Sequence, residues 1–249
     1  MSALHWSKLR FMRQSPAHYH HFSRVPFTMT PAMRLGWLAH AVILGTDEPP
    51  VVWEGHRRGK DWTAFKEQHD PDRIVTASEM ATAEAIAVAV LDNEEAAAVL
   101  EDGDRERSME WEFAGRACAG RMDVAGRGLT ELKITDSDPA KFPWHARKMA
   151  WHGQMAWYGE GARLAYGVEF DRYSVVAVEP KPPHAVCVYD LSERTVEEGT
   201  RLWRSLFDQL LVCESSDAWP GYSQTILPWD VPEDDDVTLI IGGREMEIE

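Results

Sequence analysis

The stretch from about Arg107 to Thr135 constrains the fold more than any other, because it reads as three strands in close succession. Its runs SMEWEF, RACAGRMDV and LTELKIT are separated by glycine-containing turns, the last of which is the AGRG sequence at 125–128. Short runs of this kind, broken by glycine turns, predict strands that pair with their neighbours in the chain. The stretch therefore predicts an antiparallel β-meander.

Helix signals dominate the segment before the meander. A capping Ser or Thr stands before each of three expected helices, at positions 7, 15 and 30, and proline follows at 16 and 31. The third of these helices should end at Gly45, and a short helix is expected over 61–69. A long Ala-rich helical region should begin at Ser78, with a new cap at Asn93, and end near Gly103. Residues 1–103 are therefore expected to be mostly helical.

The segment after the meander mixes both kinds of signal. We expect one long helix from about Pro143 to Arg163, strands near 174–178 and 185–189, and an amphipathic helix from Ser192 to about Cys213. The chain ends with an EDDD run and VTLII-GG-REMEIE, which reads as a hairpin with a two-glycine turn. We expect a mixed α/β protein with one domain over 1–230 and an appendage, an acidic linker and hairpin, over 231–249.

Composition excludes several protein classes. The 249 residues are 44% hydrophobic, which is enough for a substantial core. No apolar run approaches the roughly 18 residues that span a bilayer, and the N-terminus lacks the hydrophobic core of a secretory signal. We expect a soluble, cytoplasmic protein with no membrane partner. The three cysteines are far apart and form no C-x-x-C pair, so neither a disulfide framework nor a zinc or iron-sulfur site is indicated.

The positive charges are concentrated in the chain, although its formal net charge is −15. Residues 1–46 hold five basic and no acidic residues, among them Arg10 and Arg13, and a second cluster contains Arg57, Arg58 and Lys60. Cations grouped in this way suit contacts with a phosphate backbone. We therefore expect DNA to be contacted by Arg10, Arg13, Arg57, Arg58 and Lys60. A solvated loop explains the second cluster equally well.

The sequence GRMDVAGRGLTELK at 120–133 puts charged side chains in an expected sheet. Side chains alternate along a strand, so Glu131 and Lys133 should share one face, and the turn should bring Asp123 opposite Glu131 or one step away. Two carboxylates, with waters and the carbonyl of Leu132, suit Mg²⁺, and Lys133 could orient a water and stabilise charge on a phosphate. Taken alone, an E-x-K pair is more often an exposed ion pair.

Two helices supply further candidates. His40 lies four residues after Gly36, on one face of the helix that begins near position 31. In the helix expected over 143–163, Arg147, Trp151, Gln154 and Tyr158 fall on one narrow stripe. Gln154 and Tyr158 could donate hydrogen bonds to a phosphate oxygen, and Arg147 could add charge. A lone histidine is more often structural, and Trp151 competes as a core residue.

Together, G-x-x-x-H at 36–40, G-x-x-D at 120–123, E-x-K at 131–133 and Q-x-x-x-Y at 154–158 resemble the RecB-type branch of the PD-(D/E)-x-K nucleases. Within that branch the chain is most similar to the RecE-type exonucleases, exodeoxyribonuclease VIII and its phage relatives. The similarity covers about residues 4–230 and includes TPAMRLGWLAHAVILG and ELKITDSDPAKF. Many RecE-type sequences have Asp where this chain has Glu131, and the motif accepts either.

The resemblance implies a restriction-endonuclease-like core, with a central mixed sheet flanked by helices, a helical part at 1–103 and a catalytic core at 104–213. It implies that His40, Asp123, Glu131 and the Leu132 carbonyl hold the metal. It also implies that Lys133 is the catalytic lysine and that Gln154 and Tyr158 support the substrate.

The family further implies Mg²⁺-dependent degradation of one strand from a double-stranded DNA end, 5′ to 3′, with Mn²⁺ able to substitute. The resulting 3′ overhang would pass to a single-strand annealing protein in phage-type recombination. The enzyme is expected to be a ring-shaped homo-oligomer, a trimer or a tetramer. Two alternatives stay open: an endonuclease of the same fold that cuts restriction sites or junctions, and a DNA-end-binding protein without turnover.

Overall fold

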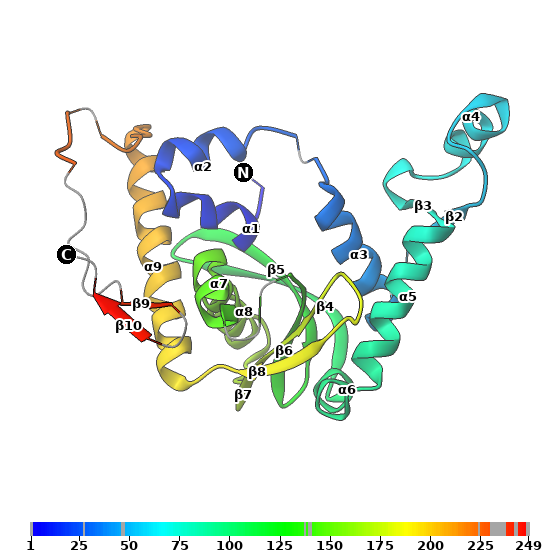
Figure 1. Cartoon of the computed structure of the whole chain (residues 1–249). Coiled ribbons are helices and arrows are strands. Elements are labelled where there is room, and N and C mark those ends of the chain that lie inside the picture. Colours follow the sequence, from blue (N-terminus) through cyan, green and yellow to red (C-terminus); the bar gives the residue numbers. More distant parts are fainter. Residues whose placement is uncertain are drawn as a thin grey trace.

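The computed structural model describes residues 2–26, 28–45, 48–136, 138, 141–223 and 225–229, and the backbone of 238–241 and 244–247 (Figure 1). Before the meander the elements are β1 (Leu4–His5), α1 (Trp6–Leu9), η1 (Arg10–Arg13), α2 (Pro16–Phe22), α3 (Pro31–Leu44), β2 (Val51–Trp53), α4 (Gly59–Gln68), η2 (Pro71–Arg73), β3 (Ile74–Thr76), α5 (Ala77–Leu91) and α6 (Glu94–Glu101). The elements that follow are β4 (Asp104–Phe113), β5 (Arg116–Ala125), β6 (Gly128–Ile134), α7 (Phe142–Met149), α8 (Trp151–Tyr166), β7 (Arg172–Val178), β8 (Val186–Asp190), α9 (Glu193–Ser216), β9 (Thr238–Ile241) and β10 (Arg244–Glu247).

A six-stranded mixed sheet forms the centre of the molecule. Its strand order is β1-β5-β6-β7-β8, and β4 pairs with β5. The predicted meander is confirmed, since β4, β5 and β6 pair antiparallel in succession. The two strands expected after it are β7 and β8, and β7 lies parallel to β6. The mixed α/β fold with a central sheet is therefore confirmed.

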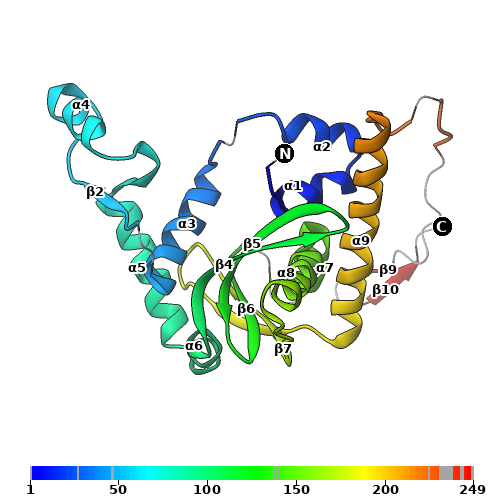
Figure 2. The same ribbon diagram turned by 180° about the vertical axis from the view of Figure 1, so that it is seen from behind.

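Helices cover both faces of this sheet (Figures 1 and 2). Each covered face contains its own hydrophobic core. The first layer is formed by α1, η1, α7, α8 and α9, and its core includes Trp111, Trp157 and Trp203. The second layer is formed by α3, α5 and α6, and its core includes Leu132 and Val176 of the sheet. The sheet thus has an apolar layer on each side, as strands with two buried faces require.

The segment at 48–76 forms an arm that extends beyond the second layer, with α4 at its tip (Figure 1). Its strands β2 and β3 pair in parallel as a separate two-stranded sheet. Trp53, Trp62 and Phe65 pack their rings together there, with centroid separations of 4.7–6.5 Å. The sequence did not predict these strands, because three residues are too few to show a strand period.

The helix expected over 143–163 is in fact two helices, so this prediction was wrong. Ala150 adopts a left-handed conformation with φ 58°, which ends α7 and begins α8 in a new direction. Arg147 therefore leaves the expected stripe and forms an ion pair with Glu198 at 2.8 Å. Trp151, Gln154 and Tyr158 stay together on α8.

Several predicted helix starts are confirmed by side-chain caps. Ser15, Thr30, Asn93 and Ser192 each accept a backbone N–H of the helix that follows. Two starts were placed wrongly, at positions 7 and 78. The first helix begins at Trp6 without a side-chain cap, and Thr76 caps α5 in a capping box with Glu79.

The end of the chain contains the expected hairpin, because β9 and β10 pair antiparallel. Its two-glycine turn and the acidic run lie outside the described residues. The division into one domain at 1–230, with parts at 1–103 and 104–213, and an appendage at 231–249 stays a prediction. Within the described part of the chain, no helix has both the length and the apolar character needed to cross a bilayer.

Candidate active site

The candidate site lies at a gap along one edge of β5. The other edge of β5 pairs with β4 along nearly its whole length. At the gapped edge, β6 pairs with residues 124 and 125, and the short parallel strand β1 pairs with residues 118 and 119. Within the described part of the chain, no strand pairs with the intervening residues, 120–123, on that edge. Strands β5 and β6 therefore separate just after their shared turn.

Side-chain hydrogen bonds replace the missing ladder bonds in this gap. The backbone N–H of Leu132 donates to Oδ2 of Asp123 at 2.8 Å, and the backbone N–H of Asp123 donates to Oε1 of Glu131 at 3.3 Å. Asp123 and Glu131 are both buried, at 7% and 1% exposure. The sequence left their register open, and the turn pairing of Val124 with Thr130 places the two carboxylates opposite one another.

The alternation of side chains along β5 breaks at Asp123. Met122 belongs to the core of the first layer, whereas Val124 belongs to the core of the second. In a regular strand, residues two apart point to the same face. Regular alternation after Met122 therefore turns Asp123 towards the second layer, and the break lies between Asp123 and Val124, which both face that layer.

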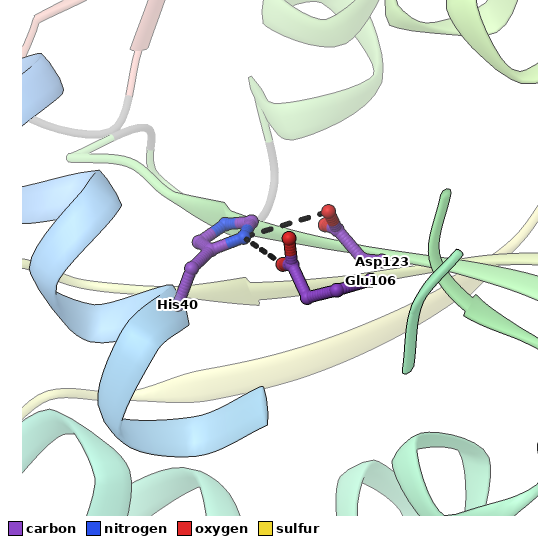
Figure 3. A group of neighbouring side chains, drawn as sticks. All are labelled: His40, Glu106 and Asp123. Atoms are coloured by element: carbon purple, nitrogen blue, oxygen red, sulfur yellow. Dashed lines mark ion pairs between the residues drawn. The ribbon is translucent and has the colours of Figure 1, made fainter. Parts of the chain in front are cut away.

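The side chain from the second layer is His40, near the end of α3. Its Nδ1 lies 3.5 Å from Oδ1 of Asp123, and its Nε2 lies 3.0 Å from the carbonyl oxygen of Leu132. Nδ1 also lies 3.9 Å from Oε1 of Glu106 on β4 (Figure 3). Donor atoms of His40, Glu106 and Asp123 all lie within 4.8 Å of one another, which makes them a group able to hold a metal ion.

Three polar side chains lie on the opposite side of the gap, Lys133 from β6 and Gln154 and Tyr158 from α8 of the first layer. Lys133 forms an ion pair with Oε2 of Glu131 at 2.7 Å. Gln154 donates to the same carboxylate oxygen at 3.0 Å, and its Nε2 lies 3.1 Å from the Tyr158 hydroxyl. The predicted pairing of Glu131 with Lys133 on one face, and the approach of Gln154 and Tyr158, are therefore present in the structure.

Gly120 explains how the Tyr158 ring fits. A Cβ atom at this position would lie 2.8 Å from Cε1 of Tyr158 and 3.1 Å from Cε of Met109. Such a separation is too short for two carbon atoms in van der Waals contact. The glycine of the G-x-x-D motif thus provides the space for the tyrosine of the Q-x-x-x-Y motif.

These groups line one open pocket of about 560 Å³. Its walls include His40, Asp123, Glu131, Lys133 and Tyr158, and also His5 and Arg121, which the sequence did not indicate. Arg121 forms an ion pair with Glu106 at 2.9 Å and is 61% exposed. The sequence signal that could have indicated Arg121 is its position directly after Gly120, the glycine of the G-x-x-D motif.

Burial and mutual charge shift the pKa values of the group. Burial raises the pKa of Glu131, the Asp123 charge raises it further, and it reaches about 7 in spite of Lys133. Burial alone would raise the pKa of Asp123, but His40 and Lys133 outweigh burial and lower it. Burial alone would lower the pKa of His40, but Asp123 raises it to about 10. The site thus holds two carboxylates of different basicity between two cations.

The chemistry of these donors fits a hard divalent ion. Carboxylates, a backbone carbonyl and an imidazole are the donor types at the site, and Mg²⁺ prefers oxygen ligands in octahedral geometry. Adjacent ligands of an octahedral Mg²⁺ lie about 3 Å apart. Nε2 of His40 and the Leu132 oxygen are at hydrogen-bond distance, 3.0 Å, and two atoms this close could occupy two such positions once the imidazole proton is lost.

The six predicted DNA-facing cations lie elsewhere on the described surface, since none of them lines this pocket. Arg13 and Arg147 meet in another pocket of about 350 Å³, where Arg13 donates to the carbonyl of Lys148 at 2.8 Å. The remaining four are Arg10 in η1, Arg57 and Arg58 just before α4, and Lys60 at its start. Arg57 forms an ion pair with Glu79 at 3.1 Å.

Comparison with known proteins identifies one family. A family of PDDEXK-like domains of unknown function, DUF3799, matches residues 6–227. No curated protein matches the sequence. Among solved structures, a candidate exonuclease from Eubacterium rectale is similar to the chain over 92% of its length and 90% of that protein's chain. The two are 13% identical and have a TM-score of 0.64, which is a likeness of fold alone. A second solved structure, SSO0001, is 15% identical over 84% of each chain, but its TM-score of 0.31 is too low to bear on the fold.

Proposed function

Because this chain belongs to the family of PDDEXK-like domains of unknown function, DUF3799, and is thereby a metal-dependent nuclease, we propose that it is a DNA exonuclease. The observation that carries this proposal is the meeting of His40, Asp123, Glu131 and Lys133 in one pocket, supplied from helix α3 and from strands β5 and β6. An exposed ion pair, the alternative for E-x-K, does not fit Glu131, which is 1% exposed.

We assign the metal to His40, Asp123, Glu131 and the carbonyl of Leu132, with Mg²⁺ as the cofactor and Mn²⁺ as a substitute. When bound, such an ion supplies charge neutralisation at a phosphate and lowers the pKa of a coordinated water. Asp123 is already oriented for this role, because the N–H of Leu132 fixes one of its oxygens.

Lys133 is assigned as the catalytic lysine, since its ammonium lies on the pocket wall beside Glu131. There it can orient the attacking water and stabilise the negative charge that grows on the phosphate oxygens. Gln154 and Tyr158 are assigned to the substrate. Both side chains present hydrogen-bond donors to the same pocket, and Gln154 also restrains the Glu131 carboxylate.

We further propose RecE-type action, which is degradation of one strand of a duplex from its end, 5′ to 3′, leaving a 3′ overhang. This rests on the order of the four motifs, and the exonuclease name of the Eubacterium rectale protein agrees with it. A ring-shaped homo-oligomer, a single-strand annealing partner, a role in phage-type recombination and a cytoplasmic location follow from the same resemblance. Arg10, Arg13, Arg57, Arg58, Lys60 and Arg147 stay proposed DNA contacts away from the catalytic pocket.

The test compares linear duplex DNA with a covalently closed circle of the same sequence. We expect Mg²⁺-dependent shortening of the linear DNA and no cutting of the circle. Rapid cutting of the circle would establish the endonuclease alternative. Binding to ends without loss of DNA would establish the end-binding alternative.

The matched variants are Lys133→Ala, expected to remove activity without unfolding the protein, and Lys181→Ala, which removes the same charge at an exposed turn between β7 and β8 and should keep cleavage. Full activity of Lys133→Ala would mean that this lysine does not serve the reaction.

A further inference from the structure

Glu106 has an unusual backbone at a position directly across from Asp123. In the β4–β5 ladder, Arg105 pairs with Val124 and Arg107 pairs with Met122, and the position between them has no pair. Glu106 itself has φ 52°, in the left-handed region. For a residue with a Cβ this conformation costs on the order of 1 kcal/mol or more, and it persists where the surrounding fold holds it.

The carboxylate of Glu106 faces the site histidine on one side (Figure 3), and it contacts an arginine on the other. Oε2 accepts the Nε–H of Arg121 at 2.9 Å, and Oε1 lies 3.9 Å from Nδ1 of His40. The other imidazole nitrogen, Nε2, lies 3.0 Å from the carbonyl oxygen of Leu132. The two ring nitrogens therefore serve different partners: Nδ1 faces carboxylates and Nε2 faces the proposed metal ligand.

Glu106 stands behind His40 rather than in the catalytic pocket. It lines a neighbouring pocket of about 690 Å³ together with Arg105 and Arg121. His40 and Asp123 line the catalytic pocket, and Glu106 does not. The carboxylate is thus placed to act on the imidazole and not on a substrate.

A histidine that binds a metal through one nitrogen usually donates the N–H of the other to a carboxylate or a carbonyl, which fixes its tautomer and its orientation. Two carboxylates face Nδ1 of His40, those of Asp123 and Glu106. Asp123 is assigned to the metal, so Glu106 is the carboxylate left for Nδ1. A hydrogen bond requires about 2.7–3.2 Å, so a movement of about 1 Å closes the present 3.9 Å separation.

We propose that Glu106 is a positioning residue, which Arg121 holds in place and which orients His40 so that Nε2 binds the metal beside the Leu132 carbonyl. The left-handed conformation at position 106 gives this carboxylate its place behind the ring. This inference deepens the proposed function and rests on it, because it needs a metal at His40.

The test measures Mn²⁺ binding to the full-length protein by calorimetry and electron paramagnetic resonance, alongside cleavage of linear duplex DNA. Glu106→Gln should weaken Mn²⁺ binding about 10-fold or more, and saturating Mn²⁺ should restore most of the cleavage. Glu106→Gly should show the same loss, and it guards against misfolding because glycine accepts φ 52° without strain. Glu112→Gln, an equal charge change at an exposed position of the same strand, should bind Mn²⁺ as the wild type does.

A double variant separates positioning from direct ligation. If Glu106 acts through the imidazole, Glu106→Gln should weaken Mn²⁺ binding no further in a His40→Ala background. An additive loss would overturn the proposal, because Glu106 would then bind the ion itself. Unchanged binding in both Glu106 variants would overturn it as well.

The wild-type protein tests the proposed function separately. If it binds Mn²⁺ but leaves DNA intact, the nuclease proposal fails, while weaker Mn²⁺ binding by the Glu106 variants still supports the positioning role. If it binds no Mn²⁺, both proposals fail.

Discussion

Replacement of Glu131 by glutamine should stabilise the metal-free protein. Glu131 is buried beside Asp123, and its pKa is raised from 4.5 to about 7. Each pKa unit corresponds to about 1.4 kcal/mol, so the ionised carboxylate costs the folded state about 3 kcal/mol. Glutamine has nearly the same shape and carries no charge. Glu131→Gln should therefore raise the free energy of unfolding by about 3 kcal/mol at pH 8.

The pH dependence follows from the direction of the shift. The folded protein holds its proton on Glu131 more tightly than the unfolded chain does. Stability is therefore lost as pH rises from 4.5 towards 7, and no loss exists below about pH 4. The advantage of Glu131→Gln should be full at pH 8 and absent at pH 4.

Urea unfolding in the presence of a chelator, at pH 4 and at pH 8, measures the difference in free energy of unfolding between Glu131→Gln and the wild type. With Mg²⁺ added, only the wild type should gain its full metal stabilisation, so the gap at pH 8 should narrow. Asp123→Asn should instead lower the free energy of unfolding. The pKa of Asp123 is lowered, so its charge stabilises the folded state. A variant Glu131→Gln that is less stable than the wild type at pH 8 would refute the reasoning, because the bonds from Lys133 and Gln154 would then outweigh the repulsion.

Three further substitutions test other parts of the structure. Gly120→Ala should displace the Tyr158 ring, reduce DNA cleavage about 10-fold and lower the free energy of unfolding by about 1–3 kcal/mol. Cleavage at the wild-type rate would show that the ring position does not matter. Ala150→Gly should raise the free energy of unfolding by up to about 1 kcal/mol in urea, because φ is 58° there; a loss of stability would contradict this. Thr76→Ala should lower the melting temperature and cost about 1 kcal/mol, since it removes the capping box with Glu79; an unchanged melt would mean that the β2–β3 arm holds α5 without it.

The sequence predicted those parts of the fold that depend on neighbours in the chain. The meander was readable because its turns contain glycine, and four helix starts were readable because a hydroxyl or an amide caps each of them. The break at Ala150 was not, because alanine gives no signal for a left-handed conformation that only the packed structure holds. The misplaced Arg147 is a direct result of that break.

The sequence predicted those residues of the candidate site that belong to a recognisable motif. His40, Asp123, Glu131 and Lys133 were named from spacing and resemblance, and the structure brings them to one pocket. Glu106 was missed because it lies in no motif. Its place depends on a backbone conformation and on pairing across β4 and β5, which sequence spacing does not show.

The gap between β5 and β6 has a mechanical consequence. His40 comes from the helices on one side of the sheet, and the Glu131 carboxylate is anchored by Gln154 from the helices on the other. An ion held by His40 and Glu131 together would act as a crosslink through the sheet, tying α3 to α8 where no strand pairing does so. Metal removal should then loosen α3 more than the remote helix α9, and amide hydrogen exchange would register the difference helix by helix.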